Sequence, residues 1–155
     1  MLGGSMNSGL RIRLSVMMFL QYAIWGAWSP FLWRILTAPK SDGGLAMTDV
    51  QAGWIFGLLW LACILAPFTG GQVADRWVPT QKFLGVAHFI GGVLLILAAK
   101  ASSVTSMNLT MAAYCLLYAP TLALTNSLAF HHLGDQKDFG RIRVWGTIGW
   151  IFAEL

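Results

Sequence analysis

Residues 50–74 read VQAGWIFGLLWLACILAPFTGGQVA and contain no Asp, Glu, Lys or Arg. A helix rises ~1.5 Å per residue and a bilayer core is ~30 Å thick, so about 20 such residues cross it. Three further uncharged runs occur, at 14–33, 83–99 and 101–134. The run at 83–99 is slightly short for a span. Lys82 and Lys100 flank it, and their apolar stems can extend so that the charged groups reach the membrane surface. The sequence therefore predicts several helices that cross a membrane.

The composition excludes an ordinary soluble domain. Hydrophobic residues make up 57% of the 155 residues and charged residues only 10%, and the mean hydropathy is +0.65. A soluble fold of this size could not bury so much apolar surface, and its amphipathic helices would carry charges along one face. We expect lipid to be the solvent of most side chains.

The expected fold is an all-α integral membrane protein, a partial helix bundle of about four and a half transmembrane helices. Residues 1–12 would form a cytoplasmic amino terminus and residues 13–155 the bundle. Its helices are expected at 13–36, 49–73, 82–100, 107–131 and 141–155. Thr48 and Gln51 have the spacing of a capping box that opens the second helix. The last helix is too short to cross, so we expect the chain to lack the carboxyl-terminal half of a longer polypeptide.

The basic residues predict the orientation. Translocating Lys or Arg is resisted, so the side with more of them faces the cytoplasm. One side holds Arg11, Arg13, Arg76, Lys82, Lys137, Arg141 and Arg143, and the other holds Arg34, Lys40 and Lys100. The amino terminus is therefore expected to be cytoplasmic, in a multi-pass protein of the plasma membrane. The net charge of +4 is explained by this asymmetry and does not indicate a nucleic-acid partner.

Polar side chains inside the spans are the candidates for function, because they are costly in lipid and usually face a bundle interior. Gln21 and Trp25 lie one helical turn apart in the first helix; a membrane-interface role for the tryptophan is the alternative. In the fourth helix, Tyr118 and Thr125 belong to one polar stripe, and Asn126 lies one residue beyond it. Such residues either line a pathway or hydrogen-bond neighbouring helices together.

The last helix carries its polar residues on one face. Arg143, Thr147, Trp150 and Glu154 follow one another at helical spacing. A lipid-facing carboxylate is expensive, so Glu154 is expected to point inward and to serve a proton or polar pathway. Arg143 has an alternative role as an anchor at the cytoplasmic surface.

The sequence does not predict an enzyme, a cofactor or a metal site. It contains no nucleophile with a neighbouring base, no glycine-rich phosphate loop and no metal-ligand cluster. Cys63 and Cys115 lie in apolar runs, where buried thiols are usually inert. His131 and His132 are adjacent and point in different directions, which makes them a poor metal pair.

The stretch GGQVADRW at 70–77 resembles the signature of the major facilitator superfamily, a G-x-x-x-D-R element between the second and third helices. The resemblance implies that Gly71 permits close helix approach and that Asp75 accepts hydrogen bonds from a helix amino terminus. It also implies that the guanidinium group of Arg76 donates hydrogen bonds of its own. The basic residues that usually follow this element are reduced here to Lys82.

Three blocks resemble the nucleoside:proton symporter branch of that superfamily. They are FLQYAIWGAW at 19–28, YAPTLALTNSLAF at 118–130 and IRVWGTIGW at 142–150. The resemblance implies a nucleoside site to which Arg143, Thr147 and Trp150 contribute, with Trp150 at a position that holds Phe in a relative. A nucleoside needs hydrogen bonds for its base and ribose and an aromatic face for stacking, which these side chains offer.

We therefore expect an alternating-access symporter that takes up nucleosides together with protons, with its substrate between two six-helix halves. Gln21, Trp25, Tyr118 and Asn126 complete the expected binding set. One alternative keeps the superfamily and changes the cargo to another small solute, such as a sugar. A second alternative is a helical membrane subunit that transports nothing.

Overall fold

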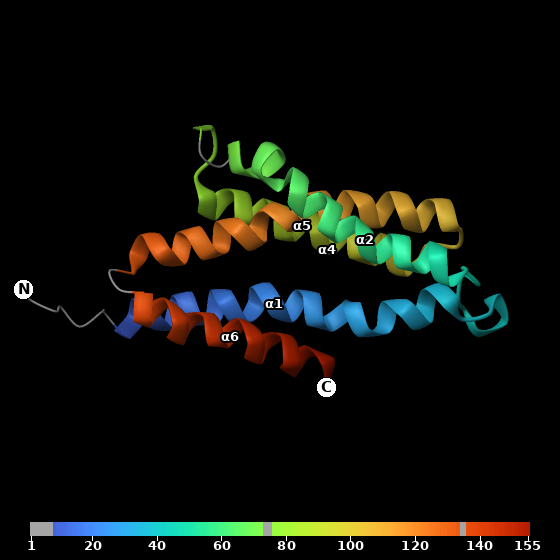
Figure 1. The fold of residues 1–155 in the computed structure, drawn as a ribbon, viewed down its shortest axis with the longest axis horizontal. Coiled ribbons are helices and arrows are strands. Elements are labelled where there is room, and N and C mark those ends of the chain that lie inside the picture. The colour runs from blue at the N-terminus through green and yellow to red at the C-terminus, as the bar shows by residue number, and fades with distance from the viewer. Residues whose placement is uncertain (1–7, 73–75, 134–135) are drawn as a thin grey trace, which may run out of the picture. The chain divides into compact units, whose positions relative to one another are not determined.

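The computed structural model describes residues 8–72, 76–133 and 136–155, and these residues form helices joined by short connections (Figure 1). The helices are α1 (Ser8–Thr37), α2 (Asp49–Ala66), α4 (Thr80–Ala99), α5 (Val104–His132) and α6 (Gln136–Glu154). A 3-10 turn, η1 (Lys40–Asp42), follows α1, and a π-helical turn, η2 (Pro67–Gly71), follows α2. The expected all-α fold is confirmed.

The helices begin and end where local signals favour it. Thr48 caps α2 with the expected capping box: its hydroxyl accepts from the backbone N–H of Gln51 at 3.3 Å, and the Gln51 side chain accepts from the backbone N–H of Thr48 at 3.0 Å. α6 starts five residues before the expected 141, with Asp138 in its first turn, where a carboxylate favours the positive end of the helix dipole. Pro67 marks the change from α2 to η2.

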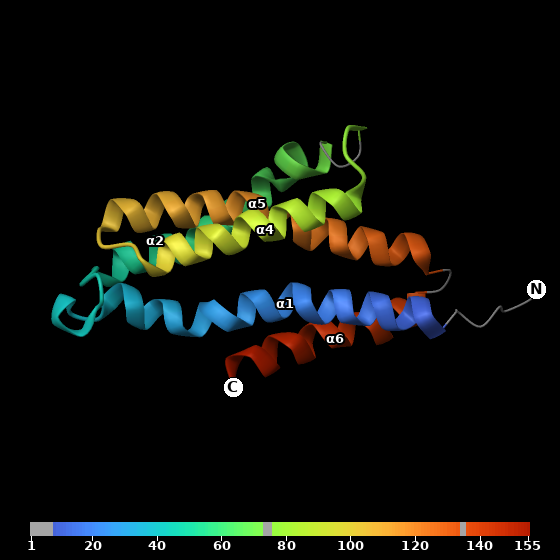
Figure 2. The ribbon, with the colours of Figure 1, turned by 180° about the vertical axis from the view of Figure 1, so that it is seen from behind.

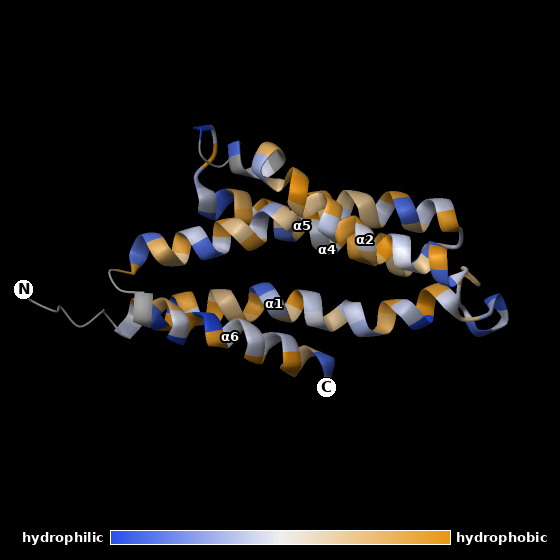
Figure 3. Cartoon of the chain, in the orientation of Figure 1, coloured by the Kyte–Doolittle hydropathy of each residue, from blue (hydrophilic) through white to orange (hydrophobic). Residues whose placement is uncertain are grey.

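Within the described residues, three helices are long and apolar enough to cross a bilayer, namely Asp49–Ala66, Thr80–Ala99 and Val104–His132. α1 has 30 residues and spans ~45 Å, but it carries more polar residues and three arginines. Figure 3 shows the contrast, with hydrophobic residues dominating α2 and α4 and hydrophilic residues recurring along α1 and α6.

The chain divides into two compact units. Unit 1 comprises Met1–Phe31 and Thr125–Leu155, and unit 2 comprises Leu32–Leu124. In unit 1, α6 runs beside the amino-terminal part of α1 (Figure 2), and Met18 and Ile142 are fully buried. In unit 2, α2, α4 and most of α5 bury residues such as Ile55, Met111 and Tyr114. Each unit has a core of its own.

Candidate functional site

In unit 1, α1 and α6 approach closely because glycines line their contact. A Cβ atom on Gly26 would collide with the backbone oxygen of Trp150, and one on Gly149 would collide with that of Phe19. Each glycine thus faces the backbone of the opposite helix, as in close helix pairs within membranes. This contact fixes which side chains of α1 can meet those of α6.

Arg143 lies over an aromatic ring of α1. Its guanidinium carbon is 4.1 Å from the centroid of the Tyr22 ring, and the side chain is half-buried. A cation over an aromatic face is attracted by the ring, most strongly where water is excluded. Gly146 leaves the space for this pair, because a Cβ there would lie 2.7 Å from the Tyr22 ring and 2.8 Å from a guanidinium nitrogen of Arg143. Arg143 is therefore held against α1 in unit 1, and its guanidinium N–H groups, which can only donate, form no hydrogen bond to the described residues.

A buried hydrogen bond joins α1 to the last part of α5. The Thr125 hydroxyl donates to the side-chain oxygen of Gln21 at 3.1 Å, and both residues are almost fully buried. Gln21 is adjacent to Tyr22, so one turn of α1 contacts α5 through its amide and α6 through its phenol ring. Polar contacts of this kind hold membrane helices in register.

Two buried polar atoms of unit 1 lack a hydrogen-bond partner among the described residues. They are the side-chain oxygen of Asn126 on α5 and the indole nitrogen of Trp150 on α6. A buried donor or acceptor without a partner costs roughly 1–3 kcal/mol, so such atoms in a folded protein need an explanation. The Asn126 oxygen is an acceptor and the Trp150 N–H is a donor. A ligand that carries both donors and acceptors could therefore satisfy both atoms.

The other predicted site residues of unit 1 are more open. Thr147 is exposed, and Trp25 is half-buried. Glu154 is also half-buried, and within the described ranges the one ion pair joins Asp138 to Arg141, so Glu154 forms no ion pair there. Unit 1 thus holds every predicted binding residue of α1 and α6, together with Asn126.

Tyr118 belongs to unit 2, whereas the residues above belong to unit 1. Its ring stacks on that of Tyr114 with centroids 5.4 Å apart, and the His88 ring lies 6.3 Å away. The His88 ring nitrogen Nδ1 is 2.9 Å from the backbone oxygen of Leu84, one turn earlier on the same helix. The tyrosine is buried among aromatic neighbours.

The signature element is described only in part. Gly71 is the last residue of η2, and Arg76 is exposed after it. Asp75 lies outside the described residues, so its predicted contacts have no structural counterpart here.

Two residues of the site were not among the predicted binding set. Tyr22 pairs with Arg143, and Thr125 pairs with Gln21. Thr125 could have been found from the polar stripe of its helix. For Tyr22 the sequence offers less: it follows Gln21 directly within the aromatic-rich block at 19–28.

Among the described residues, no group of three or more His, Cys, Asp or Glu could hold a metal ion. A bundle with long apolar helices and polar side chains gathered on the facing sides of α1, α5 and α6 defines a multi-pass membrane protein with a polar interior site.

Comparison with known proteins identifies the family. Residues 8–155 match the family described as nucleoside H+ symporter, and the chain belongs to this family of transporters within the major facilitator superfamily. It is 41% identical to YegT of Escherichia coli K12 over 92% of its own length and 32% of that protein. It is 31% identical to the nucleoside permease NupG of the same organism over 93% of its length and 34% of NupG.

The fold agrees with solved structures. A crystal structure of the nucleoside transporter NupG superposes with a TM-score of 0.81 at 30% identity, covering 93% of this chain and 36% of that one. A crystal structure of a NupG mutant gives a TM-score of 0.83. The chain thus spans about one third of the length of the relatives that it matches.

Proposed function

We propose that the protein takes part in proton-coupled nucleoside uptake by alternating access, with this chain supplying one wall of the substrate pathway. Family membership supports transport over the alternative of a non-transporting subunit. Relatives of this chain are named for nucleoside cargo, including the nucleoside permease NupG and the xanthosine permease of E. coli K12, which is 30% identical over 93% of this chain. The missing second wall would come from a further part of the same polypeptide.

The observation that carries the proposal is the combination of side chains in unit 1. Arg143 is held over Tyr22 at 4.1 Å, and the indole nitrogen of Trp150 and the amide oxygen of Asn126 are buried with no hydrogen-bond partner in the described part of the chain. A nucleoside offers ring nitrogens and carbonyls as acceptors, hydroxyls as donors and an aromatic face. Arg143, Trp150 and Asn126 are assigned to hydrogen bonds with base and ribose.

The remaining assignments rest on position. Thr147 lies on the same face of α6 as Arg143, and we assign it a hydrogen bond to the substrate. Gln21, Trp25 and Tyr118 are proposed to complete the pathway from α1 and α5. Glu154, half-buried one turn beyond Trp150, is proposed to carry a proton or to order water on that face.

The signature element and the membrane orientation complete the proposal. Gly71, Asp75 and Arg76 are assigned to a loop that controls helix movement, because short charged loops between spans can switch between two sets of contacts. The amino terminus is assigned to the cytoplasm and the protein to the bacterial inner membrane, as the asymmetry of basic residues favours.

Uptake of radiolabelled uridine by the full-length protein, in cells without other nucleoside transporters, tests the function. Arg143→Ala should lower uptake about ten-fold or more, because a charge-assisted hydrogen bond is lost. Arg34→Ala, at the exposed opposite end of α1, is the matched control and should leave uptake unchanged. A protonophore should abolish accumulation in the wild type. Uptake that survives both Arg143→Ala and the protonophore would refute the proposed mechanism.

A sugar is the second candidate cargo. The chain is 26% identical over 88% of its length to the maltose permease of Geobacillus stearothermophilus. A ligand that binds the folded state raises its melting temperature, so thermal-shift screening separates the two cargos. Stabilisation by maltose and not by uridine or adenosine would favour the sugar.

A further inference from the structure

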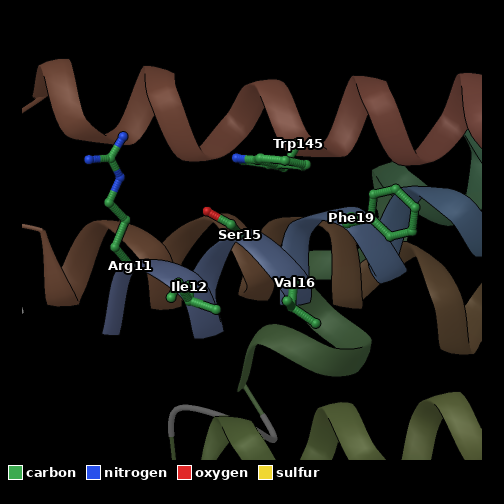
Figure 4. Close-up of a pocket in the computed structure, with 6 residues that line it drawn as sticks. All are labelled: Arg11, Ile12, Ser15, Val16, Phe19 and Trp145. Atoms are coloured by element: carbon green, nitrogen blue, oxygen red, sulfur yellow. The ribbon is translucent and has the colours of Figure 1, made fainter. Parts of the chain in front are cut away.

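A groove between α1 and α6 lies near the start of α1 and is distinct from the polar site described above. Its volume is about 420 Å³, and six side chains line it: Arg11, Ile12, Ser15, Val16, Phe19 and Trp145 (Figure 4). All six belong to unit 1. The proposed transport function assigns no role to any of them.

The polar groups of this groove are mainly hydrogen-bond donors. The Arg11 side chain extends from α1 toward α6, and the Trp145 ring projects from α6 with its nitrogen turned to the side on which Arg11 lies (Figure 4). The Ser15 hydroxyl lies below this ring and faces the same space. An arginine and an indole only donate, and a hydroxyl can donate as well. The arrangement suits an anion with several acceptor oxygens, such as a phosphate diester.

The rest of the groove is apolar and open. Ile12 is 63% exposed, Val16 is 50% exposed and Trp145 is 45% exposed. Phe19 stands further along α1, beyond Val16, on the side away from Arg11 (Figure 4). The groove therefore has a cationic end and an apolar end. A molecule that fills it must have an anionic head and a hydrocarbon body.

The charge of Arg11 is not balanced by a neighbouring carboxylate in the described part of the chain. The ion pair found there joins Asp138 to Arg141, and Arg13 adds a second exposed positive charge close to Arg11 on α1. In a membrane protein, a basic helix end attracts anionic lipids at roughly 1 kcal/mol per Lys or Arg near the surface. Charge complementarity thus favours a lipid with net negative charge over a zwitterionic one.

We propose that this groove binds one anionic glycerophospholipid. The headgroup phosphate accepts hydrogen bonds from Arg11, Ser15 and Trp145, and an acyl chain lies along Ile12, Val16 and Phe19. A lipid bound here contacts both α1 and α6, the two helices that carry Tyr22 and Arg143. The proposal does not depend on which solute is transported.

Native mass spectrometry of the full-length protein tests the proposal, with phosphatidylglycerol and phosphatidylcholine offered in equal amounts. The wild type should retain phosphatidylglycerol in preference. Arg11→Gln should lower its retention about five-fold, the ratio that corresponds to roughly 1 kcal/mol. Trp145→Phe, which keeps the apolar ring and removes the N–H, should lower it by a smaller factor. Arg34→Gln, at the exposed far end of α1, should have no effect.

Three results would overturn the proposal. Equal retention of the two lipids would show that the groove does not select an anionic head. Unchanged retention in Arg11→Gln would place the lipid elsewhere or show that another polypeptide segment covers the groove. Displacement of phosphatidylglycerol by millimolar inorganic phosphate would identify a free anion, not a lipid, as the occupant. A melting-temperature increase with phosphatidylglycerol that Arg11→Gln removes would support the proposal independently.

Discussion

The helix contacts of unit 1 and unit 2 are built from different side chains. In unit 1, α1 meets α6 through Gly26 and Gly149, and polar groups lie beside this contact. In unit 2, α4 meets α5 through rings: the His88 ring lies 6.3 Å from that of Tyr118, and Tyr114 lies 3.5 Å from where a Cβ on Gly91 would be. A cavity of about 280 Å³ between α2 and α5 in unit 2 is lined by apolar side chains and the Cys63 thiol. In unit 1 a close backbone contact positions polar side chains, whereas in unit 2 aromatic rings and small apolar side chains fill the space between the helices.

The largest expected effect breaks the close contact of unit 1. Gly149→Ala should destabilise the fold by about 1–3 kcal/mol, because its Cβ collides with the backbone of Phe19 and one of the two helices must shift. Gly92→Ala on α4 is the matched control, since nothing lies within 4 Å of its Cβ position, and better helix propensity should leave stability equal or slightly higher. Unfolding in detergent measures both. If both variants lost the same free energy of unfolding, the close backbone contact of unit 1 would not be the feature that distinguishes it from unit 2.

A second substitution sharpens the assignment of the unpartnered donor. Trp150→Phe keeps an aromatic face but removes the indole N–H, so uridine affinity should fall about two- to ten-fold, the value of a single hydrogen bond. The control is Trp54→Phe in unit 2, on an α2 residue that is 58% exposed. Binding is measured by scintillation proximity on the purified full-length protein. Identical affinities for Trp150→Phe and the wild type would mean that the N–H does not meet the substrate.

The smallest effect concerns the hydrogen bond between α1 and α5. A double-mutant cycle of Gln21→Leu and Thr125→Val should give a coupling energy of about 0.6 kcal/mol, the average for hydrogen bonds between membrane helices. Unfolding of the two single variants and the double variant supplies the measurement. Additive effects would show that the 3.1 Å contact between these side chains contributes nothing to stability.

Periodicity in the sequence predicts the faces of helices but not their partners. The spacing of Arg143, Thr147 and Trp150 is enough to place them on one face of α6. The partner of Arg143 could not be derived this way, because the contact with Tyr22 depends on how α6 docks on α1, and Gly26 and Gly149 set that docking from distant parts of the chain. Contacts between distant segments require the tertiary packing itself.

The same limit explains the mixed outcome on α5. The sequence predicts one role for Tyr118 and Asn126, because both are polar residues of the same helix. The two compact units divide α5 between Leu124 and Thr125, so Tyr118 joins the aromatic cluster of unit 2 and Asn126 joins unit 1. Helical spacing is a local property, so it cannot show that the two ends of one helix belong to different compact units.

If the polar face of α6 lines a watery nucleoside site, a thiol at position 147 must be reachable from water. In a full-length protein with Cys63 and Cys115 replaced by alanine, Thr147→Cys should react with a charged thiol reagent, and uridine should slow that reaction. Ile148→Cys, on the next residue of the helix, which is also exposed, should react slowly and at a rate that uridine does not change. A position 147 that is sealed from the reagent, or labelled at the same rate with and without uridine, would contradict the proposed site.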